Sequence, residues 1–313
     1  MSFALFFDPE APKPKRASRP LHTPLRCMIA GVAVDRLTMD EAAAQIVEEL
    51  VHPTASAPFL IMGPNAQLVT LAQHNLRFAE ALHASALNIP DGISVILASK
   101  LLGRPISRRV PGGELMEELC REAARSGLRV FFLGGLPGAA ELAAQQLQRR
   151  YPSLSVAGVY CPPYGFERDA VENAHVRRRI AEAEPDLLFV AFGAPRQEIW
   201  MHENCPSLPI GAALSVGAAL DTQAGLRKRA PRWTHSLGVE WLYRLACEPR
   251  RLWRRYLIGN THFIYLVLKQ LFFYPPFPGR KVEQSHTDRK PSPFAVSSSI
   301  SVACESAEVK SQA

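Results

Sequence analysis

Short apolar runs recur along the chain and alternate with segments of helical periodicity. Such runs are typical of buried strands, and the segments between them are long enough to form helices. The predicted strands are Cys27–Val34, Phe59–Met62, Leu87–Ile89, Arg129–Leu133, Val156–Tyr160, Leu187–Phe192 and Ile210–Val216.

Helices fit the intervals between the predicted strands. Residues 38–41, Thr-Met-Asp-Glu, have the form of a capping box, which predicts a helix that begins there and continues to Leu50. Strands and helices in strict alternation predict an α/β fold with a parallel sheet covered by helices on both faces. Further helices are predicted at Ala66–His83, Ile93–Leu102, Glu114–Ser126, Ala139–Arg150, Val171–Ala183 and Gln197–Glu203.

The two ends of the chain have compositions that cannot pack a core. Residues 1–24 combine proline with lysine and arginine, and residues 279–313 are rich in serine and charge. Both segments are predicted to be disordered tails, the first of them basic. The part predicted to fold consists of a core over residues 25–232 and a helical appendage over residues 233–278.

The predicted appendage interleaves aromatic residues and leucine with arginine. A membrane span needs about 20 mostly apolar residues. The pattern instead predicts a basic amphipathic element that lies on an anionic bilayer surface and does not cross it. The apolar stretch Leu257–Tyr274 is interrupted by Asn260, His262, Lys269 and Gln270.

Composition narrows the class of protein. With 47% hydrophobic residues, the 313-residue chain can bury a substantial core. Its six cysteines lack the spacing of a zinc site, so we expect reduced thiols and no structural metal. The first residues do not have the form of a secretory signal, and we expect a cytoplasmic protein. The net charge of +7 suits nucleic acid, anionic lipid or phosphorylated substrates alike.

Four loops directly follow predicted strands and are expected to meet at one edge of the sheet, where ligands of such folds bind. In the first loop, Asn65 either caps the next helix or hydrogen-bonds a ligand. In the second, Asp91 either caps a helix or accepts a proton from an attacking hydroxyl. Both interpretations are open for each residue at this point.

The third loop contains Gly134 and Gly135 after the strand Arg129–Leu133. Glycines there let backbone amides approach a diphosphate at the start of the next helix, and a turn that serves helix packing is the alternative. The spacing is not G-x-G-x-x-G, and no acidic residue follows the next strand. Both features disfavour a dinucleotide-binding site.

The fourth loop begins a helix with Arg196, Gln197 and Glu198. Proline and glutamate are ordinary residues at a helix start. Gln197 gains nothing obvious from that position, so we expect it to bind a ligand.

Positive charge concentrates near these loops and in the appendage. Arg109 and the basic run Gly225–Arg232 contribute to it. An arginine face could bind a diphosphate without a metal ion, although a solvated face is the alternative. The chain has no D-x-D pair that would hold a divalent ion beside a nucleotide diphosphate. A helix over Trp241–Tyr256 would place three arginines on one face, namely Arg244, Arg251 and Arg254.

A series of short motifs links these loops to the appendage. In chain order they are Pro64-Asn65, Pro90-Asp91-Gly92, Arg109-Val110-Pro111-Gly112, Phe132-Leu133-Gly134-Gly135, Gly193-Ala194-Pro195-Arg196-Gln197-Glu198, Val216-Gly217-Ala218-Ala219-Leu220-Asp221, Arg229-Ala230-Pro231, Glu240-Trp241-Leu242-Tyr243-Arg244-Leu245 and Glu248-Pro249-Arg250-Arg251-Leu252. Each motif is weak alone. In this order they resemble the WecG/TagA/CpsF family of bacterial glycosyltransferases, over Cys27–Phe263.

The resemblance implies a Rossmann-like core with an appendage that closes the site at the inner face of the plasma membrane. The implied reaction is an inverting transfer of a hexose from a UDP-sugar to a sugar linked to undecaprenyl diphosphate. It would need no metal ion or other cofactor. Such a reaction serves the synthesis of exopolysaccharide, another cell-surface polysaccharide or a teichoic-acid-like polymer.

The resemblance also assigns roles to residues. Asp91 resembles the general base of the family, and Arg109 resembles a pocket residue that we expect to stabilise the departing UDP. Asn65 and Gln197 resemble further pocket residues, and Asp221 falls near the nucleotide site. The arginines that resemble those that hold the diphosphate are Arg244, Arg251 and Arg254.

One position departs from the family pattern. The family usually has threonine two residues before the pocket asparagine, and this chain has Gly63. The loss of a hydroxyl near the sugar leaves the donor open among N-acetylmannosamine, glucose and uronic-acid types, because substrate choice rests on a few such groups.

Two other functions remain open on the residues alone. The alternating pattern and the glycine turn could serve a nucleotide-dependent oxidoreductase. The arginines interleaved with aromatic residues could bind nucleic acid, although the same pattern suits a membrane surface and a diphosphate. The sequence does not decide whether the core self-associates.

Overall fold

A computed structural model describes residues 25–53, 58–227 and 249–273 of the chain, and its side chains in the last range from Gly259 onward. These residues all lie within one compact unit, Met1–Pro276. The two predicted tails and the predicted domain boundary at Trp233 lie outside the described residues. Those parts of the domain division therefore stay predictions.

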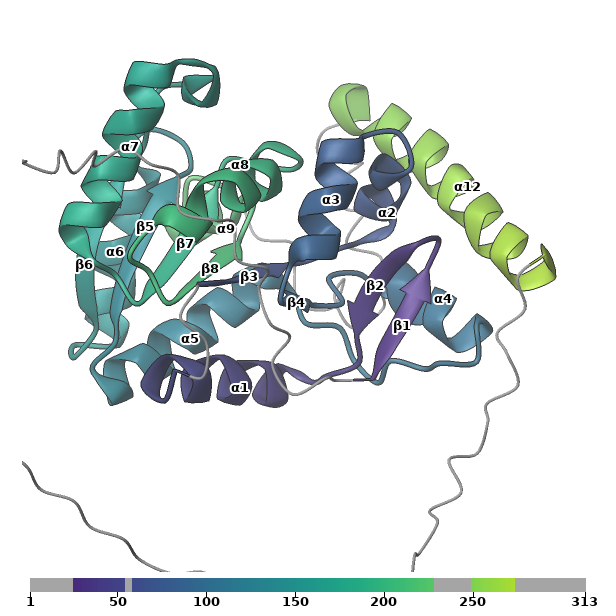
Figure 1. Cartoon of the computed structure of the whole chain (residues 1–313), viewed down its shortest axis with the longest axis horizontal. Coiled ribbons are helices and arrows are strands. Elements are labelled where there is room, and N and C mark those ends of the chain that lie inside the picture. The colour runs from purple at the N-terminus through teal and green to yellow at the C-terminus, as the bar shows by residue number, and fades with distance from the viewer. Residues whose placement is uncertain (1–24, 54–57, 228–248, 274–313) are drawn as a thin grey trace, which may run out of the picture. The chain divides into compact units, whose positions relative to one another are not determined.

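The centre of the fold is a six-stranded sheet in the order β4-β3-β8-β7-β5-β6 (Figure 1). Every pair of neighbouring strands in this sheet is parallel. The predicted α/β fold with a Rossmann-like parallel sheet is thus confirmed. The strands are β3 (Phe59–Met62), β4 (Leu87–Asn88), β5 (Arg129–Gly134), β6 (Ser155–Tyr160), β7 (Leu187–Ala191) and β8 (Ala212–Ser215).

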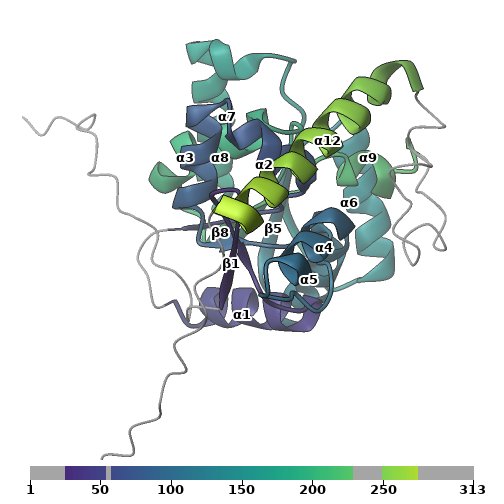
Figure 2. The same ribbon diagram turned by 90° about the vertical axis from the view of Figure 1, so that its right-hand side faces the viewer.

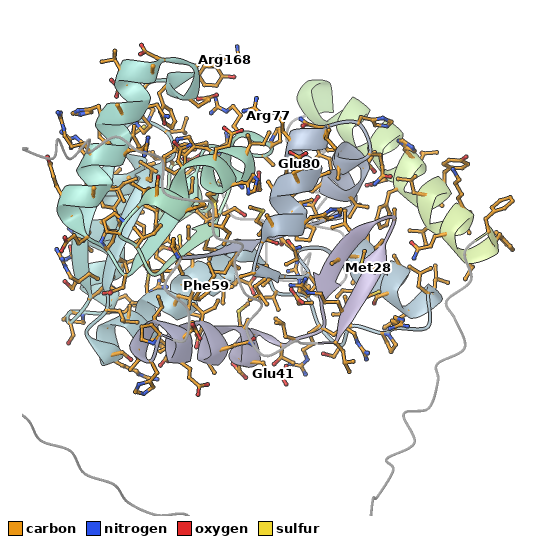
Figure 3. All side chains as sticks on the ribbon, viewed as in Figure 1. Met28, Glu41, Phe59, Arg77, Glu80 and Arg168 are labelled. Carbon is orange, nitrogen blue, oxygen red and sulfur yellow. The ribbon has the colours of Figure 1, made fainter. Side chains whose placement is uncertain are left out.

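Helices cover both faces of the sheet, and side chains fill the space on each face (Figures 1 and 3). Successive residues of a strand point to opposite faces, so Phe59 and Ile61 pack into one hydrophobic cluster, and Leu60 and Met62 into the other. One cluster is covered by α1 (Met39–Val51), α5 (Gly112–Ser126), α6 (Ala139–Arg150) and α9 (Ala219–Gln223). The other is covered by α2 (Ala66–Ala72), α3 (Leu76–Ala84), α4 (Ile93–Leu101), α7 (Ala170–Ala183), α8 (Arg196–Asn204) and α12 (Pro249–Phe273).

The predicted strand Cys27–Val34 is wrong. The segment forms an antiparallel hairpin of β1 (Arg26–Ile29) and β2 (Val32–Asp35), separate from the main sheet. Ala30 and Gly31 both have positive φ, 46° and 82°, as the two central residues of a type I′ turn require. Alanine is not a typical residue of such a turn, so the sequence pattern predicts one continuous strand here.

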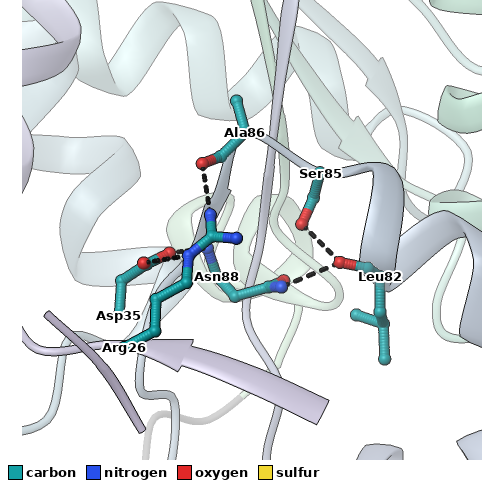
Figure 4. Close-up of polar contacts among 6 residues, drawn as sticks. All are labelled: Arg26, Asp35, Leu82, Ser85, Ala86 and Asn88. Carbon is teal, nitrogen blue, oxygen red and sulfur yellow. Dashed lines mark hydrogen bonds and ion pairs between the residues drawn. The ribbon is translucent and has the colours of Figure 1, made fainter. Parts of the chain in front are cut away.

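The hairpin is attached to the edge strand β4 through the buried carboxylate of Asp35 (Figure 4). Its Oδ2 accepts a hydrogen bond from the backbone N–H of Asn88 at 2.6 Å, and its Oδ1 accepts one from Nε of Arg26 at 2.7 Å. Nη2 of Arg26 donates to the carbonyl of Ala86 at 2.9 Å. Burial raises the pKa of the Asp35 carboxyl, although these hydrogen bonds act in the opposite direction. On the open edge of β4, where no further strand pairs with it, the Asp35 carboxylate thus accepts the hydrogen bond of a backbone N–H group.

Two other expectations about helices are corrected. The predicted helix Ala66–His83 is two helices, α2 and α3, because Asn75 caps α3 by accepting a hydrogen bond from the N–H of Phe78 at 3.1 Å. The five-residue helix α9 was not expected, since it is too short to show a helical period. The capping box of α1 at Thr38 and Glu41 is confirmed.

The helix α12 packs against α2 and the hairpin (Figures 1 and 2). Phe263 and Val267 are buried in the same hydrophobic cluster as α2. The side-chain amide of Gln270 accepts a hydrogen bond from the N–H of Ala30 at 2.7 Å and donates one to the carbonyl of Met28 at 2.9 Å. In the described ranges, none of the helices has the length and apolar character needed to cross a bilayer.

Replacing Asp35 by alanine would leave the buried N–H of Asn88 without its acceptor. We expect the variant Asp35→Ala to lower the free energy of unfolding by about 1–3 kcal/mol, the usual cost of an unsatisfied buried donor. Urea denaturation measures this change. Glu182→Ala, which removes an exposed carboxylate of a surface ion pair, is the control and should cost less than about 1 kcal/mol. Equal losses in the two variants would contradict the role of Asp35.

Candidate functional site

Because all six strands are parallel, the loops that follow them lie along one edge of the sheet, which we call the rim. The strand order fixes the order of these loops along the rim. From one end they are residues 89–92 after β4, 63–65 after β3, 216–218 after β8, 192–195 after β7 and 135–138 after β5. The four loops expected to share one edge therefore do so.

The loops that carry Asp91 and Asn65 touch at the β4 end of the rim. The backbone N–H of Asp91 donates to the carbonyl of Pro64 at 3.3 Å. A Cβ placed on Gly92 would be 3.2 Å from the Cβ of Asn65, and one placed on Gly63 would be 3.1 Å from the Cβ of Asp91. The two loops are thus in direct contact, and Asp91 is partly exposed.

The structure answers the question of helix capping differently for the two residues. Oδ1 of Asn65 caps α2, since it accepts hydrogen bonds from the N–H groups of Gln67 and Leu68 at 3.1 and 3.2 Å. The N-cap of α4 is Gly92, without a side-chain hydrogen bond. Asp91 is therefore not that N-cap but the residue before it, two residues before the first helical residue, Ile93.

The segment that carries Arg109 joins this group. The N–H of Val110, the next residue, donates to the carbonyl of Pro90 at 2.8 Å. A Cβ on Gly112 would be 3.1 Å from the carbonyl oxygen of Ser215, so the start of α5 touches the end of β8. Arg109 is partly buried beside the loop of Asp91.

Gly134 and Gly135 form a turn that only glycine adopts readily. Their φ angles are 98° and 86°, and a Cβ on Gly134 would be 2.8 Å from the carbonyl oxygen of Ala191. Asp221 holds this turn: its Oδ1 accepts from the N–H of Leu136 at 2.7 Å, and its Oδ2 lies 3.3 Å from Nε of Arg227. Asp221 is buried, with both carboxylate oxygens engaged.

Gln197 has a structural role that the sequence analysis did not find. Its side chain is buried, and its Oε1 accepts hydrogen bonds from the N–H groups of Gly193 at 3.1 Å and Gly217 at 3.2 Å. These glycines belong to the loops after β7 and β8. One amide therefore ties two neighbouring loops of the rim together, and no sequence pattern reveals a contact of that kind.

Glu198 binds the other end of the Gln197 amide. Its Oε1 accepts a hydrogen bond from Nε2 of Gln197 at 2.7 Å, which fixes which end of the Gln197 amide faces the loops. Burial raises the pKa of Glu198 to about 7, although hydrogen bonds from Gln197 and Ser215 lower it. The sequence analysis treated this residue only as a helix opener.

An aromatic side chain at the rim was also missed. Tyr164, in the loop after β6, is 91% exposed, and the guanidinium of Arg196 lies 4.2 Å from the centre of its ring. Nη2 of Arg196 donates to the carbonyl of Phe192 at 2.9 Å. Its position directly after a strand is the signal that could have identified Tyr164.

The predicted site residues in the core fall into two groups joined by Gln197. Asp91, Asn65 and Arg109 lie at the β4 end, and the glycine turn with Asp221 lies at the β5 end. Four strand spacings separate β4 from β5, roughly 19 Å across the sheet. A ligand that uses both groups must be extended. Arg244 lies outside the described residues, and Arg251 and Arg254 lie in α12 where side chains are not described.

Comparison with known proteins identifies the family. A sequence model of the glycosyl transferase WecG/TagA/CpsF family matches residues 27–275. The chain belongs to this family. The resemblance drawn from the motifs is therefore confirmed, and membership decides for a glycosyltransferase over the oxidoreductase and the nucleic-acid-binding module.

Two similar proteins have names that state an activity. One from Bacillus spizizenii strain W23 is 32% identical over 227 residues, which is 72% of this chain and 85% of the relative. One from Staphylococcus aureus strain NCTC 8325 is 32% identical over 243 residues, 77% of this chain and 91% of the relative. Both are named N-acetylglucosaminyldiphosphoundecaprenol N-acetyl-beta-D-mannosaminyltransferase.

The buried carboxyl of Glu198 predicts a pH dependence of stability. Its pKa is about 7 in the folded chain and near 4.5 when exposed, so between these values the folded state holds a proton that the unfolded state has lost. The contribution to stability is full below pH 4.5 and is lost as the pH rises to 7, by on the order of 3 kcal/mol.

Glu198→Gln isolates this contribution, because glutamine keeps a hydrogen-bond acceptor for Gln197 and does not titrate. Denaturant unfolding at several pH values should show the wild type losing stability relative to the variant from pH 4.5 to 7. Parallel stability curves for the two proteins would mean that Glu198 does not titrate in that range.

Proposed function

We propose that the chain transfers a hexose from a UDP-sugar to a sugar linked to undecaprenyl diphosphate, with inversion and without a metal ion. The product would serve a cell-surface polysaccharide or a teichoic-acid-like polymer. The observation that carries the proposal is the contact between the loops of Asp91 and Asn65 at one end of a rim whose other end is the glycine turn. The names of the two relatives supply the class of acceptor.

Asp91 acts as the general base. The acceptor hydroxyl oxygen attacks the anomeric carbon of the donor, the bond from that carbon to the UDP oxygen breaks, and the hydroxyl proton passes to Asp91. Its partly exposed carboxylate at a strand end suits this task, because a base must reach the hydroxyl that it deprotonates. Asn65, in contact with the neighbouring backbone, orients the sugar.

The leaving UDP carries negative charge, which cationic groups and hydrogen-bond donors must stabilise. Arg109, next to the loop of Asp91, supplies part of this positive charge. The turn at Gly134 and Gly135 has no side chains, so the nucleotide can approach its backbone. Gln197 and Asp221 hold the loops around the nucleotide in position. The rest comes from the appendage arginines Arg244, Arg251 and Arg254, which form charge-assisted hydrogen bonds to the diphosphate.

Gly63 bears on the identity of the donor. A side chain at this position would press on Asp91, since its Cβ would be 3.1 Å from the Cβ and 3.6 Å from Oδ2 of that residue. Glycine avoids this contact and brings no hydroxyl to the sugar. The donor is accordingly a hexose of the N-acetylmannosamine, glucose or uronic-acid type, to be identified with a panel of UDP-sugars.

The enzyme works at the cytoplasmic face of the membrane as a peripheral protein. The acceptor named for the relatives is a polyprenol derivative, and this class of substrate is held in a bilayer. The appendage with its arginines would bind the anionic surface.

The variant Asp91→Asn tests the base. We expect turnover to fall by about 10²- to 10⁴-fold, the usual contribution of general-base catalysis, while the affinity for UDP changes little. Product formation from the UDP-sugar and calorimetric titration with UDP measure the two quantities. Asp40→Asn on the exposed surface of α1 is the matched control. Full activity of Asp91→Asn would remove the base from the mechanism.

The variants Arg251→Ala and Arg254→Ala test the appendage. Each loses a charge-assisted hydrogen bond to the diphosphate, and we expect kcat/KM for the UDP-sugar to fall by about 10- to 100-fold. Steady-state kinetics with Arg149→Ala, an exposed arginine in the last turn of α6, as the control separates this loss from a general loss of positive charge. If the arginine variants match the control, the appendage does not hold the diphosphate.

A further inference from the structure

Large apolar side chains are exposed on α4, a helix of the core whose surface the reaction itself does not require. Leu97 and Leu101 are 54% and 60% exposed. They are four residues apart, so they lie on the same face of the helix one turn from each other. Exposed apolar residues that cluster in this way mark binding surfaces more often than isolated ones do.

Two neighbouring elements also expose apolar side chains. The strand β1 packs against α4 and carries the exposed side chain of Met28, labelled in Figure 3. The helix α12 is hydrogen-bonded to the same strand through Gln270. The three elements lie side by side in Figure 2. Among residues 259–273 of α12, the exposed large apolar residues are Ile264, Tyr265, Leu268, Phe272 and Phe273.

The charges on these elements fit a lipid. Residues 93–101, 26–29 and 259–273 contain no aspartate or glutamate. Lys100 and Lys269 are exposed on α4 and α12, respectively. Lysine side chains at the border of an apolar surface can reach anionic lipid head groups while the apolar residues contact acyl chains.

The position of α4 relative to Asp91 suggests which lipid. The helix begins at Ile93, directly after Gly92, so Asp91 sits at its N-terminal end. With a rise of 1.5 Å per residue, Leu97 and Leu101 lie roughly 6 and 12 Å along the axis from Ile93, the first residue of the helix. In a polyprenyl acceptor whose sugar hydroxyl contacts Asp91, only one sugar and a diphosphate separate that hydroxyl from the isoprenoid chain. The chain would therefore begin close to α4.

We propose that the isoprenoid chain of the acceptor lies on α4 against Leu97 and Leu101. The inference rests on the proposed function, which supplies a polyprenyl diphosphate as the substrate. It assigns recognition of the lipid to a helix of the core, in addition to the C-terminal appendage.

The test compares two acceptors with the same sugar diphosphate in detergent micelles, one with a polyprenyl chain and one with a short alkyl chain. The wild type should prefer the polyprenyl acceptor in kcat/KM. In the double variant Leu97→Ser, Leu101→Ser this preference should fall by at least about tenfold, because two leucines no longer bury apolar surface. The double variant Leu97→Met, Leu101→Met should keep it.

Leu76→Ser and Leu142→Ser are the controls, since both leucines are exposed on helices away from this surface. Thermal unfolding checks that the variants are folded. An unchanged preference in the serine double variant, with or without loss of vesicle binding, would overturn the inference and leave the proposed function intact. A change in molecular mass of that variant in lipid-free buffer would instead identify the surface as a contact between copies of the chain. Transfer by the wild type to neither acceptor would remove the proposed function and this inference together.

Discussion

Parallel pairing of six short, mostly buried strands is the constraint on which the rest of the structure depends. It sends every strand end of one polarity to the same edge, so the site is built by loops that are distant in sequence. It also leaves a problem at β4, an edge strand with unpaired backbone groups. The hairpin solves it with the carboxylate of Asp35, which binds the N–H of Asn88, and not with a seventh strand of the sheet.

Buried polar side chains set the shape of the rim. Burying a carboxylate or an amide is costly unless its hydrogen bonds are satisfied, and here the partners are largely loop N–H groups. Asp221 binds the N–H of Leu136 in the glycine turn, and Gln197 binds those of Gly193 and Gly217. Each buried polar side chain thus holds a loop in one conformation. The small residues of these loops could not do so by themselves. Glu198 extends this arrangement one residue further into the core.

The sequence predicts best what depends on local periodicity and worst what depends on contacts across the fold. The bounds of β3 and α6 are the predicted ones, because an apolar run or an amphipathic period is complete within each segment. The hairpin was missed since its turn begins with alanine at a positive φ.

The same limit applies to the site. Asp91 and Asn65 could be placed at the rim from their positions after strands. The structural role of Gln197 could not, since its partners lie 4 and 20 residues away, and the motifs that contain them do not show which groups meet in space. Likewise, the burial that raises the pKa of Glu198 arises from the packing of α8 against three strands, which no local motif records.

A continuous series of contacts runs from the C-terminal helix to the proposed base. Gln270 of α12 is hydrogen-bonded to Met28 in β1 and to Ala30 in the hairpin turn. Asp35 of the hairpin is in turn hydrogen-bonded to β4, which ends three residues before Asp91. Phe263 and Val267 anchor α12 in the core on the same side. These contacts connect α12, part of the proposed membrane-binding appendage, to the edge strand that precedes Asp91. The hairpin that contacts α12 and the loop that carries Asp91 are both attached to β4. The position of this edge strand therefore affects both the appendage and the proposed base.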